Sequence, residues 1–133
     1  MCVFCRIAEG SIPAYKIYED QDILAFLDIS QVTLGHCLVI PKKHFENIFE
    51  LDNKTASILF EKVVQIAKML KKNLNIENIN ILNNNGKLAY QSVNHYHIHL
   101  IPRYEDDNFK IDFPTNKLTD AEFLNLKEKI TQI

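Results

Sequence analysis

Three histidines alternate with large apolar residues in the run His95, Tyr96, His97, Ile98, His99. Successive side chains of a β-strand point to opposite faces, so the three imidazoles would share one face. Because like charges depress one another's pKa, we expect at least one ring to stay neutral near pH 7. A neutral imidazole is a good nucleophile, and attack on phosphorus would form a phosphoryl-histidine intermediate. The flanking rings could orient the middle one and donate hydrogen bonds to phosphoryl oxygens.

Two other interpretations of the run are available. A solvated polar strand face would explain a single histidine, but it explains three in strict alternation poorly. The His-x-His spacing is also common among chelating sites, so the whole run could bind a metal ion.

A second group with chemical potential is the Cys-x-x-Cys pair formed by Cys2 and Cys5. This is the spacing of a zinc knuckle, which needs two further ligands to complete a tetrahedron. The alternative is a pair of free thiols in a reducing compartment. With Cys37 the chain has an odd set of three cysteines, which argues against a disulfide framework.

Length and composition indicate one globular domain over residues 1–133, with 47% hydrophobic and 24% charged residues. A net charge of -2 provides no general cationic field for a polyanion, so we expect no nucleic acid partner. The sequence has neither a signal peptide pattern nor an apolar run long enough for a membrane span. We therefore expect a cytoplasmic location without membrane binding.

The elements that must position these side chains can be predicted from periodicity and turn residues. The first part of the chain predicts a short helix over about 3–9 and strands over 16–19, 23–27 and 37–40. Apolar residues then recur at helical spacing, which predicts a long helix starting near Asp52 or Asn53. Its stripe comprises Ala56, Leu59, Phe60, Val63, Ala67 and Leu70, widened by Ile66 and Met69. Part of so broad a stripe could face a second subunit.

The C-terminal half predicts a strand around Ile79 and Ile81, a polar turn over 83–86, and the histidine run as the last strand, closed by Pro102. A final helix is expected from about Thr119. Strands joined by short turns around one long helix predict an α+β fold with a five-stranded antiparallel sheet and short terminal helices.

The stretch 91–103 (QSVNHYHIHLIPR) resembles the signature of the histidine triad nucleotide-binding family. Further similar segments are 23–29 (ILAFLDI), 35–44 (GHCLVIPKKH) and 83–86, so the resemblance runs from about residue 2 to residue 104. It implies the HIT-like fold. A histidine at position 99 is typical of the hydrolase branches of the family, because the nucleotidyltransferase branch usually carries glutamine there. Among the hydrolases, the chain looks most similar to the bacterial Hit and Hint-like group.

The resemblance implies a role for each histidine: His97 is the nucleophile, His99 contacts the phosphate and His95 orients the site. The resemblance also implies that Asp28 accepts hydrogen bonds from the ribose hydroxyls. Without the resemblance, the sequence would indicate only an aspartate in a turn or at the end of a strand. The residues implied to line the base pocket are Ile23, Phe26 and Ile29, and those implied to contact phosphate are Asn84, Gln91 and Ser92. Core packing would equally explain the apolar three, and a turn would explain Asn84.

Similar bacterial proteins hold zinc with four residues that correspond here to Cys2, Cys5, His44 and His95. Four protein ligands leave no open position for water, so this zinc would be structural, and no catalytic metal is implied. His36 and Cys37 read as strand-entry and core residues.

One departure from the family pattern is Tyr90, where a small residue, most often glycine, is usual. Its side chain could crowd the phosphate loop, or it could turn outward and stack on a base or leaving group.

The leading hypothesis is hydrolysis of purine nucleoside phosphoramidates or related phosphoanhydrides through a nucleotidyl-histidine intermediate. A dinucleoside polyphosphate hydrolase is the alternative within the same enzyme class. The alternative from another class is a zinc-stabilised nucleotide-binding or interaction protein with little turnover. A module that repairs adenylated DNA strand breaks is disfavoured, because no basic domain or zinc finger is appended. The family also implies a homodimer.

Overall fold

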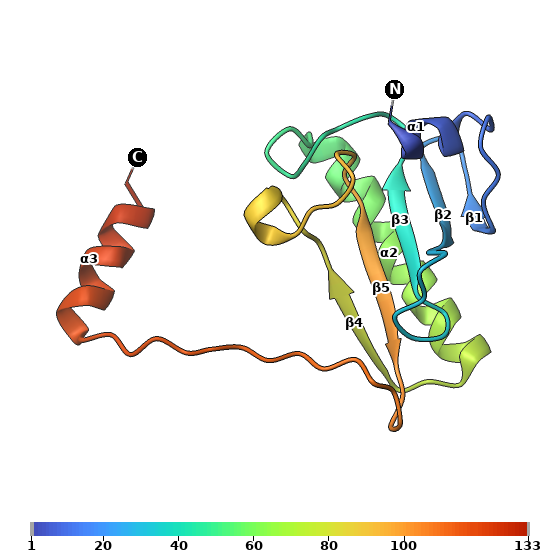
Figure 1. Ribbon diagram of the computed structural model, residues 1–133. Helices are drawn as coiled ribbons and strands as arrows, with labels where there is room; N and C mark the ends of the chain where they lie inside the picture. The colour runs from blue at the N-terminus through green and yellow to red at the C-terminus, as the bar shows by residue number, and fades with distance from the viewer. Residues whose placement is uncertain (1, 133) are drawn as a thin grey trace.

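Five antiparallel strands form one sheet in the order β1-β2-β3-β5-β4 in the computed structural model, which describes residues 2–132 (Figure 1). The elements in chain order are α1 (Val3–Ala8), β1 (Lys16–Glu19), β2 (Ile23–Leu27), β3 (Cys37–Pro41), α2 (Asn53–Leu74), β4 (Asn78–Leu82), the 3₁₀ turn η1 (Lys87–Ala89), β5 (Ile98–Arg103) and α3 (Asp120–Ile130). The predicted fold class, an α+β fold with a five-stranded antiparallel sheet and one long helix, is confirmed.

The central strands β2 and β3 are apolar along their whole length because both faces of the sheet are covered. Ile23 and Ala25 point to the face that α2 covers, together with Val39 of β3. Leu24 and Phe26 point to the opposite face and pack against α1, with Leu38 and Ile40 of β3. The sheet therefore separates a large core under α2 from a smaller one under α1.

Helix α2 is capped at both ends, and its N-cap, Asp52, is one of the two residues predicted to start it. The Asp52 carboxylate accepts a hydrogen bond from the backbone N–H of Thr55 at 2.7 Å, which satisfies one free donor of the first turn. Asn75 ends the helix in the left-handed conformation, and the stripe buried against the sheet is Leu59, Val63, Ile66 and Leu70. No helix within residues 2–132 is both long enough and apolar enough to cross a membrane.

The histidine run is only partly a strand, which corrects the prediction of a continuous last strand from His95 to Pro102. β5 begins at Ile98 and ends at Arg103. Before it, the N–H of Tyr96 donates to the carbonyl of Phe45 at 2.6 Å, outside the sheet ladder. The predicted alternation survives, because Tyr96 and Ile98 pack into the core under α2 while the imidazoles lie on the other side.

The chain leaves the sheet through a turn fastened by an ion pair and then forms an extended arm. Arg103 donates to Asp107 through Nε at 3.0 Å and through Nη2 at 3.0 Å, and this pairing lowers the pKa of Asp107 to about 2. Residues 110–132 are all exposed, and α3 stands apart from the sheet (Figure 1). A complete capping box of Thr119 and Glu122 nevertheless defines where α3 begins.

The entry to β3 requires a residue without a side chain, so we expect Gly35→Ala to destabilise the fold. Gly35 has a φ of +97°, and a Cβ there would lie 2.5 Å from Leu74 Cδ1 and 3.1 Å from Pro102 Cγ. Backbone strain and overpacking together should lower the free energy of unfolding by about 3 kcal/mol, measured by urea denaturation. The matched control is Gly10→Ala, since Gly10 has a φ of +88° with nothing within 4 Å. It should cost only about 1 kcal/mol, and equal losses would contradict the packing argument.

Candidate active site and metal site

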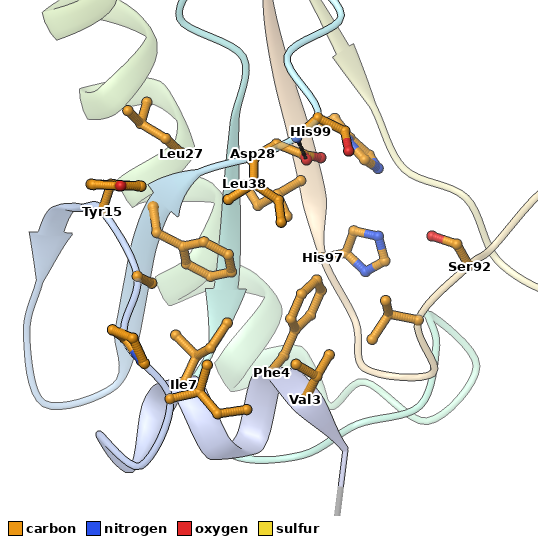
Figure 2. A pocket seen from close by; sticks show the side chains of 17 residues that line it. Val3, Phe4, Ile7, Tyr15, Leu27, Asp28, Leu38, Ser92, His97 and His99 are labelled. Carbon is orange, nitrogen blue, oxygen red and sulfur yellow. Dashed lines mark hydrogen bonds between the residues drawn. The ribbon is translucent and has the colours of Figure 1, made fainter.

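A largely apolar cavity of about 600 Å³ opens between α1, the end of β2 and the histidine run (Figure 2). Its size is within the range of small-molecule sites. Val3, Phe4 and Ile7 of α1 form one wall, and the Phe26 ring lies edge-on against that of Phe4 at 5.5 Å. The polar residues that line it include Asp28, Ser30, Ser92, His97 and His99. The cavity thus combines an apolar interior with a polar edge that contains two of the three histidines.

His97 is held in one tautomer by the backbone. Its Nδ1–H donates to the carbonyl of His95 at 2.7 Å, which leaves Nε2 with the free lone pair. The carbonyl of His97 accepts from the Asn83 side chain at 2.8 Å, and the Phe4 ring packs edge-on against the imidazole at 5.1 Å. Figure 2 shows the ring beside Ser92 at the edge of the cavity. A backbone carbonyl, and not a carboxylate, thus fixes the orientation of the His97 ring and leaves Nε2 free at the cavity.

His99 is oriented by His36, a residue that the sequence had placed only at a strand entry. The N–H of Val32 donates to His36 Nδ1 at 3.3 Å, so the proton of the neutral His36 ring is on Nε2. That Nε2–H donates to His99 Nδ1 at 2.9 Å. The proton of the neutral His99 ring is therefore on Nε2, where it can donate to an anionic ligand.

The imidazoles of the site are kept neutral mainly by burial. Burial lowers the pKa of His97, and burial followed by the neighbouring His97 and His36 rings lowers the pKa of His99 to about 4. Burial also lowers the pKa of His36 and His95. The sequence had suggested repulsion among like charges as the cause, but desolvation is the larger effect in all four rings.

Asp28 follows β2 and presents its carboxylate at the cavity edge. One oxygen accepts from the N–H of Ser30 at 2.8 Å, and the other lies 3.6 Å from His36 Nε2. The first oxygen is used by the turn that ends the strand. The second lies where a hydroxyl donor of a ligand could reach it.

The second site is a compact Cys/His group that could hold a metal ion: Cys2, Cys5, His44 and His95. The six distances among the two Sγ and two Nδ1 atoms all lie between 3.1 and 3.5 Å. Zinc with four such ligands would need separations of about 3.3 to 3.8 Å, given its usual bond lengths and tetrahedral angles. His95 Nε2–H donates to the carbonyl of Pro41 at 2.7 Å, which turns Nδ1 toward the group. The compact grouping of the four donor atoms and the tautomer of His95 both suit a tetrahedral ion.

Three residues implied to contact the nucleotide lie away from the cavity. Ile23 is fully buried in the core under α2, on the opposite face of the sheet, so the expectation that it lines the base pocket is wrong. Asn84 is half-buried in the loop and is not part of the cavity wall. Gln91 accepts from the N–H of Gly86 and donates to the carbonyls of Glu46 and Val93, so its side chain holds the loop together.

The wall supplied by α1 was missed because its apolar residues carry no signal that separates a ligand pocket from a core. Ile29 does line the cavity but is 88% exposed at its rim.

The structure also places Tyr90 outward, since this side chain is 86% exposed and is not part of the cavity wall. Its φ of +65° lies in the left-handed region, which explains why glycine suits this position.

Comparison with known proteins identifies the family of this fold and site. The model of the HIT domain matches residues 9–106. The chain belongs to the HIT family. It is 53% identical over 103 residues to Protein hit of Bacillus subtilis, covering 77% of this chain and 71% of that protein. A crystal structure of a HIT family member from Bacillus subtilis has a TM-score of 0.92 and 45% identity, covering 97% of this chain and 94% of that one.

Two further relatives have names that describe a function or a metal. The adenosine 5'-monophosphoramidase hnt1 of Schizosaccharomyces pombe is 37% identical over 131 residues, covering 98% of this chain and 96% of that protein. A zinc-bound histidine triad family protein from Mycobacterium smegmatis has a TM-score of 0.78 and 34% identity, covering 96% of each chain. Nucleotide hydrolysis and metal binding are thus both found among HIT proteins similar to this one.

The lowered histidine pKa values predict activity that persists into mildly acidic solution. Protonation of His97 would remove the lone pair of Nε2, and its pKa lies below the ordinary 6.5. We therefore expect the acidic limb of kcat/KM for nucleotide hydrolysis to be centred below pH 6.5. Recovery of the full rate after brief acid incubation would separate titration from unfolding, and a limb centred at or above 6.5 would contradict the argument.

The strained conformation of Tyr90 predicts that Tyr90→Gly stabilises the protein. Glycine relieves the left-handed strain of about 1 to 2 kcal/mol, partly offset by the greater freedom of the unfolded chain. We expect a net gain of roughly 0.5 to 1 kcal/mol in the free energy of unfolding, measured by urea denaturation. Tyr90→Ala removes the ring but keeps the strain, so it should show no such gain. Equal stability of the two variants would contradict the strain assignment.

Proposed function

We propose that this HIT protein hydrolyses purine nucleoside phosphoramidates or related phosphoanhydrides through a nucleotidyl-histidine intermediate. The observation that carries the proposal is the state of His97: neutral, with Nδ1–H bound to the carbonyl of His95 and Nε2 free at the cavity edge. An imidazole fixed in this tautomer is ready to attack phosphorus.

In the proposed complex the cavity binds the nucleoside end of the substrate. The base lies in the apolar interior of the cavity, against the side chains of α1 and Phe26, which exclude water. The carboxylate of Asp28 accepts hydrogen bonds from the ribose hydroxyls. Ser92 and the Nε2–H of His99 donate to the phosphoryl oxygens, and the backbone amides of the loop held by Gln91 add further donors.

In the proposed chemistry His97 Nε2 forms a bond to phosphorus as the phosphorus–nitrogen bond of the substrate breaks. The leaving amine takes a proton from water at the cavity mouth. The carbonyl of His95 stabilises the positive charge that develops on the ring, since it already accepts the Nδ1–H. The hydroxide left by that proton transfer then attacks phosphorus from the vacated side. The bond between phosphorus and His97 Nε2 breaks, its electron pair returns to the ring, and the nucleoside monophosphate is released with His97 neutral again.

The same site would accept a dinucleoside polyphosphate, in which a phosphate group leaves in place of an amine. The phosphoramidate is preferred because a relative covering nearly the whole chain is named as an adenosine 5'-monophosphoramidase. The alternative of a nucleotide-binding or interaction protein would keep the pocket but show little turnover.

We also propose that the Cys/His group binds one structural zinc ion. The near-regular tetrahedron of donor atoms and the zinc-bound relative support this assignment. Because two ligands are free thiols, the protein would need a reducing compartment, and we propose a cytoplasmic location. The chemistry proposed at His97 needs no catalytic metal.

Replacement of the nucleophile tests the proposed mechanism. We expect His97→Ala to lower kcat for AMP release from adenosine 5'-phosphoramidate by about a thousandfold or more, with AMP affinity within threefold of wild type. Mass spectrometry of the wild type during turnover should detect adenylylated protein, which the variant lacks. Unchanged turnover would remove His97 from the mechanism, and a wild type without turnover would favour the binding-protein alternative.

We propose a homodimer, because two apolar surfaces lie exposed on the described part of the chain. On α2, Phe60 is 54% exposed, and on α3, Phe123, Leu126 and Ile130 lie three and four residues apart and are all exposed. A helix of 11 residues is marginal alone in water, so α3 needs a packing surface. A second copy of the chain would provide one.

A charge placed on the apolar face of α3 should weaken this dimer. We expect Phe123→Asp to raise the dimer dissociation constant at least tenfold, measured by light scattering over a concentration series. Asn125→Asp adds the same charge to the same helix without removing an apolar group and should leave the constant within threefold. Equal effects, or a monomeric wild type, would contradict the proposed interface.

A further inference from the structure

One short helix connects the metal site with the nucleotide pocket. The thiols of Cys2 and Cys5, at the cap and in the first turn of α1, face the two histidines of the Cys/His group. Val3, Phe4 and Ile7 of the same helix line the cavity (Figure 2). A six-residue helix has too few internal hydrogen bonds to be stable alone. Its position must therefore come from contacts on both sides.

Phe4 is the residue of α1 that contacts both sites. Its ring is 7% exposed and lies edge-on to three other rings: Phe26 at 5.5 Å, His97 at 5.1 Å and His95 at 6.0 Å. Phe26 and His97 belong to the pocket, whereas His95 belongs to the Cys/His group. A shift of α1 would move the Phe4 ring and change the pocket wall and the packing of the nucleophile together.

His95 provides a second connection. Its Nδ1 lies in the Cys/His group, 3.3 Å from Cys2 Sγ and 3.4 Å from Cys5 Sγ, and its Nε2–H donates to the carbonyl of Pro41. Its own carbonyl accepts the Nδ1–H of His97. An ion that fixes the His95 ring would thus also restrain the backbone carbonyl that orients His97.

Without an ion, little else holds these four side chains together. Thiols are weak hydrogen-bond donors and acceptors, and two pairs of like groups, Cys2 with Cys5 and His44 with His95, face each other at 3.1 and 3.2 Å. Without the ion, Cys2 and Cys5 of α1 would have only these weak contacts with His44 and His95. The pocket wall would then keep only its apolar contacts.

We propose that zinc at the Cys/His group and nucleotide in the cavity bind cooperatively, with α1 and the Phe4 ring as the coupling element. This inference rests on the proposed nucleotide pocket and zinc site and goes beyond a purely structural role for the metal. Coupling between two sites is reciprocal: zinc tightens nucleotide binding by the same factor by which nucleotide tightens zinc binding. Disturbance of the metal site therefore lowers nucleotide affinity even though no zinc ligand lines the cavity.

The test measures both sides of the coupling on the full chain. AMP affinity is measured by calorimetry for the zinc-loaded and the zinc-free protein, with circular dichroism to show that both are folded. Zinc affinity is measured against a chromogenic chelator with and without saturating AMP. We expect both affinities to change by the same factor, about tenfold, which is within the usual range for coupled sites.

Phe4→Leu tests the route through the aromatic ring. Leucine keeps an apolar side chain and all four metal ligands but removes the edge-on contacts, so zinc stoichiometry should stay at one while the coupling factor falls to threefold or less. Phe49→Leu is the matched control, because Phe49 is 85% exposed and belongs to neither site. It should retain the full coupling factor.

The outcomes separate this inference from the proposed function. If zinc-loaded protein does not bind AMP, the proposed function itself fails. If AMP binds equally well to folded protein with and without zinc, the pocket stands and the coupling is overturned. If the zinc-free protein unfolds, the coupling factor is taken from the zinc affinity with and without AMP, and a factor that is equal in Phe4→Leu and Phe49→Leu overturns the route through Phe4.

Discussion

The hydrogen bond from His97 Nδ1 to the carbonyl of His95 is the interaction on which the site depends. It selects the tautomer of the proposed nucleophile and directs the other ring nitrogen to the cavity. A backbone carbonyl has no pKa in the working range, so this orientation does not vary with pH as a carboxylate partner's would. The carbonyl belongs to a residue whose own ring is fixed by Pro41 and by the Cys/His group.

Burial gives the site its electrostatic character. Four imidazoles lie close together, and desolvation lowers the pKa of each one, so the cluster carries little positive charge near neutrality. Phosphate oxygens would thus meet neutral N–H donors and not a cationic cluster. Such a site would select ligands by the positions of their hydrogen-bond acceptors, because neutral rings provide directed hydrogen bonds but no strong electrostatic attraction for every anion.

Much of the fold could be predicted from the residues, because the patterns that define its helices and strands involve residues close together in the sequence. Asp52 marks the start of α2, and the buried stripe follows from helical spacing. The continuous apolar runs predict β2 and β3 but not which face each side chain occupies, so they could not show that Ile23, which the resemblance implied to line the base pocket, lies on the opposite face of the sheet. Alternation placed the three histidines together, but it could not show that Tyr96 bonds to Phe45 outside the ladder.

The parts of the site that could not be predicted come from contacts between distant segments. His36 reaches His99 across 63 residues, and no local pattern distinguishes it from an ordinary buried histidine. The sequence offered no sign that Phe4 and Ile7 line a pocket, because a pocket wall and a core have the same composition. The HIT resemblance implied the nucleophile and the metal ligands that we propose, whereas the contacts of His36 and α1 could be found only in the structure.

The separation of Cys2 and His95 by 93 residues has a consequence for how the molecule is assembled. The entropic cost of joining two points grows with the length of chain between them, so these contacts close one of the longest loops in the protein. During synthesis the first helix emerges long before the strand that completes its binding partner. Strands β2 and β3, on which α1 packs, follow it closely in the chain, whereas the Cys/His group and the histidine side of the pocket can be completed only after residues 95–99 have been made.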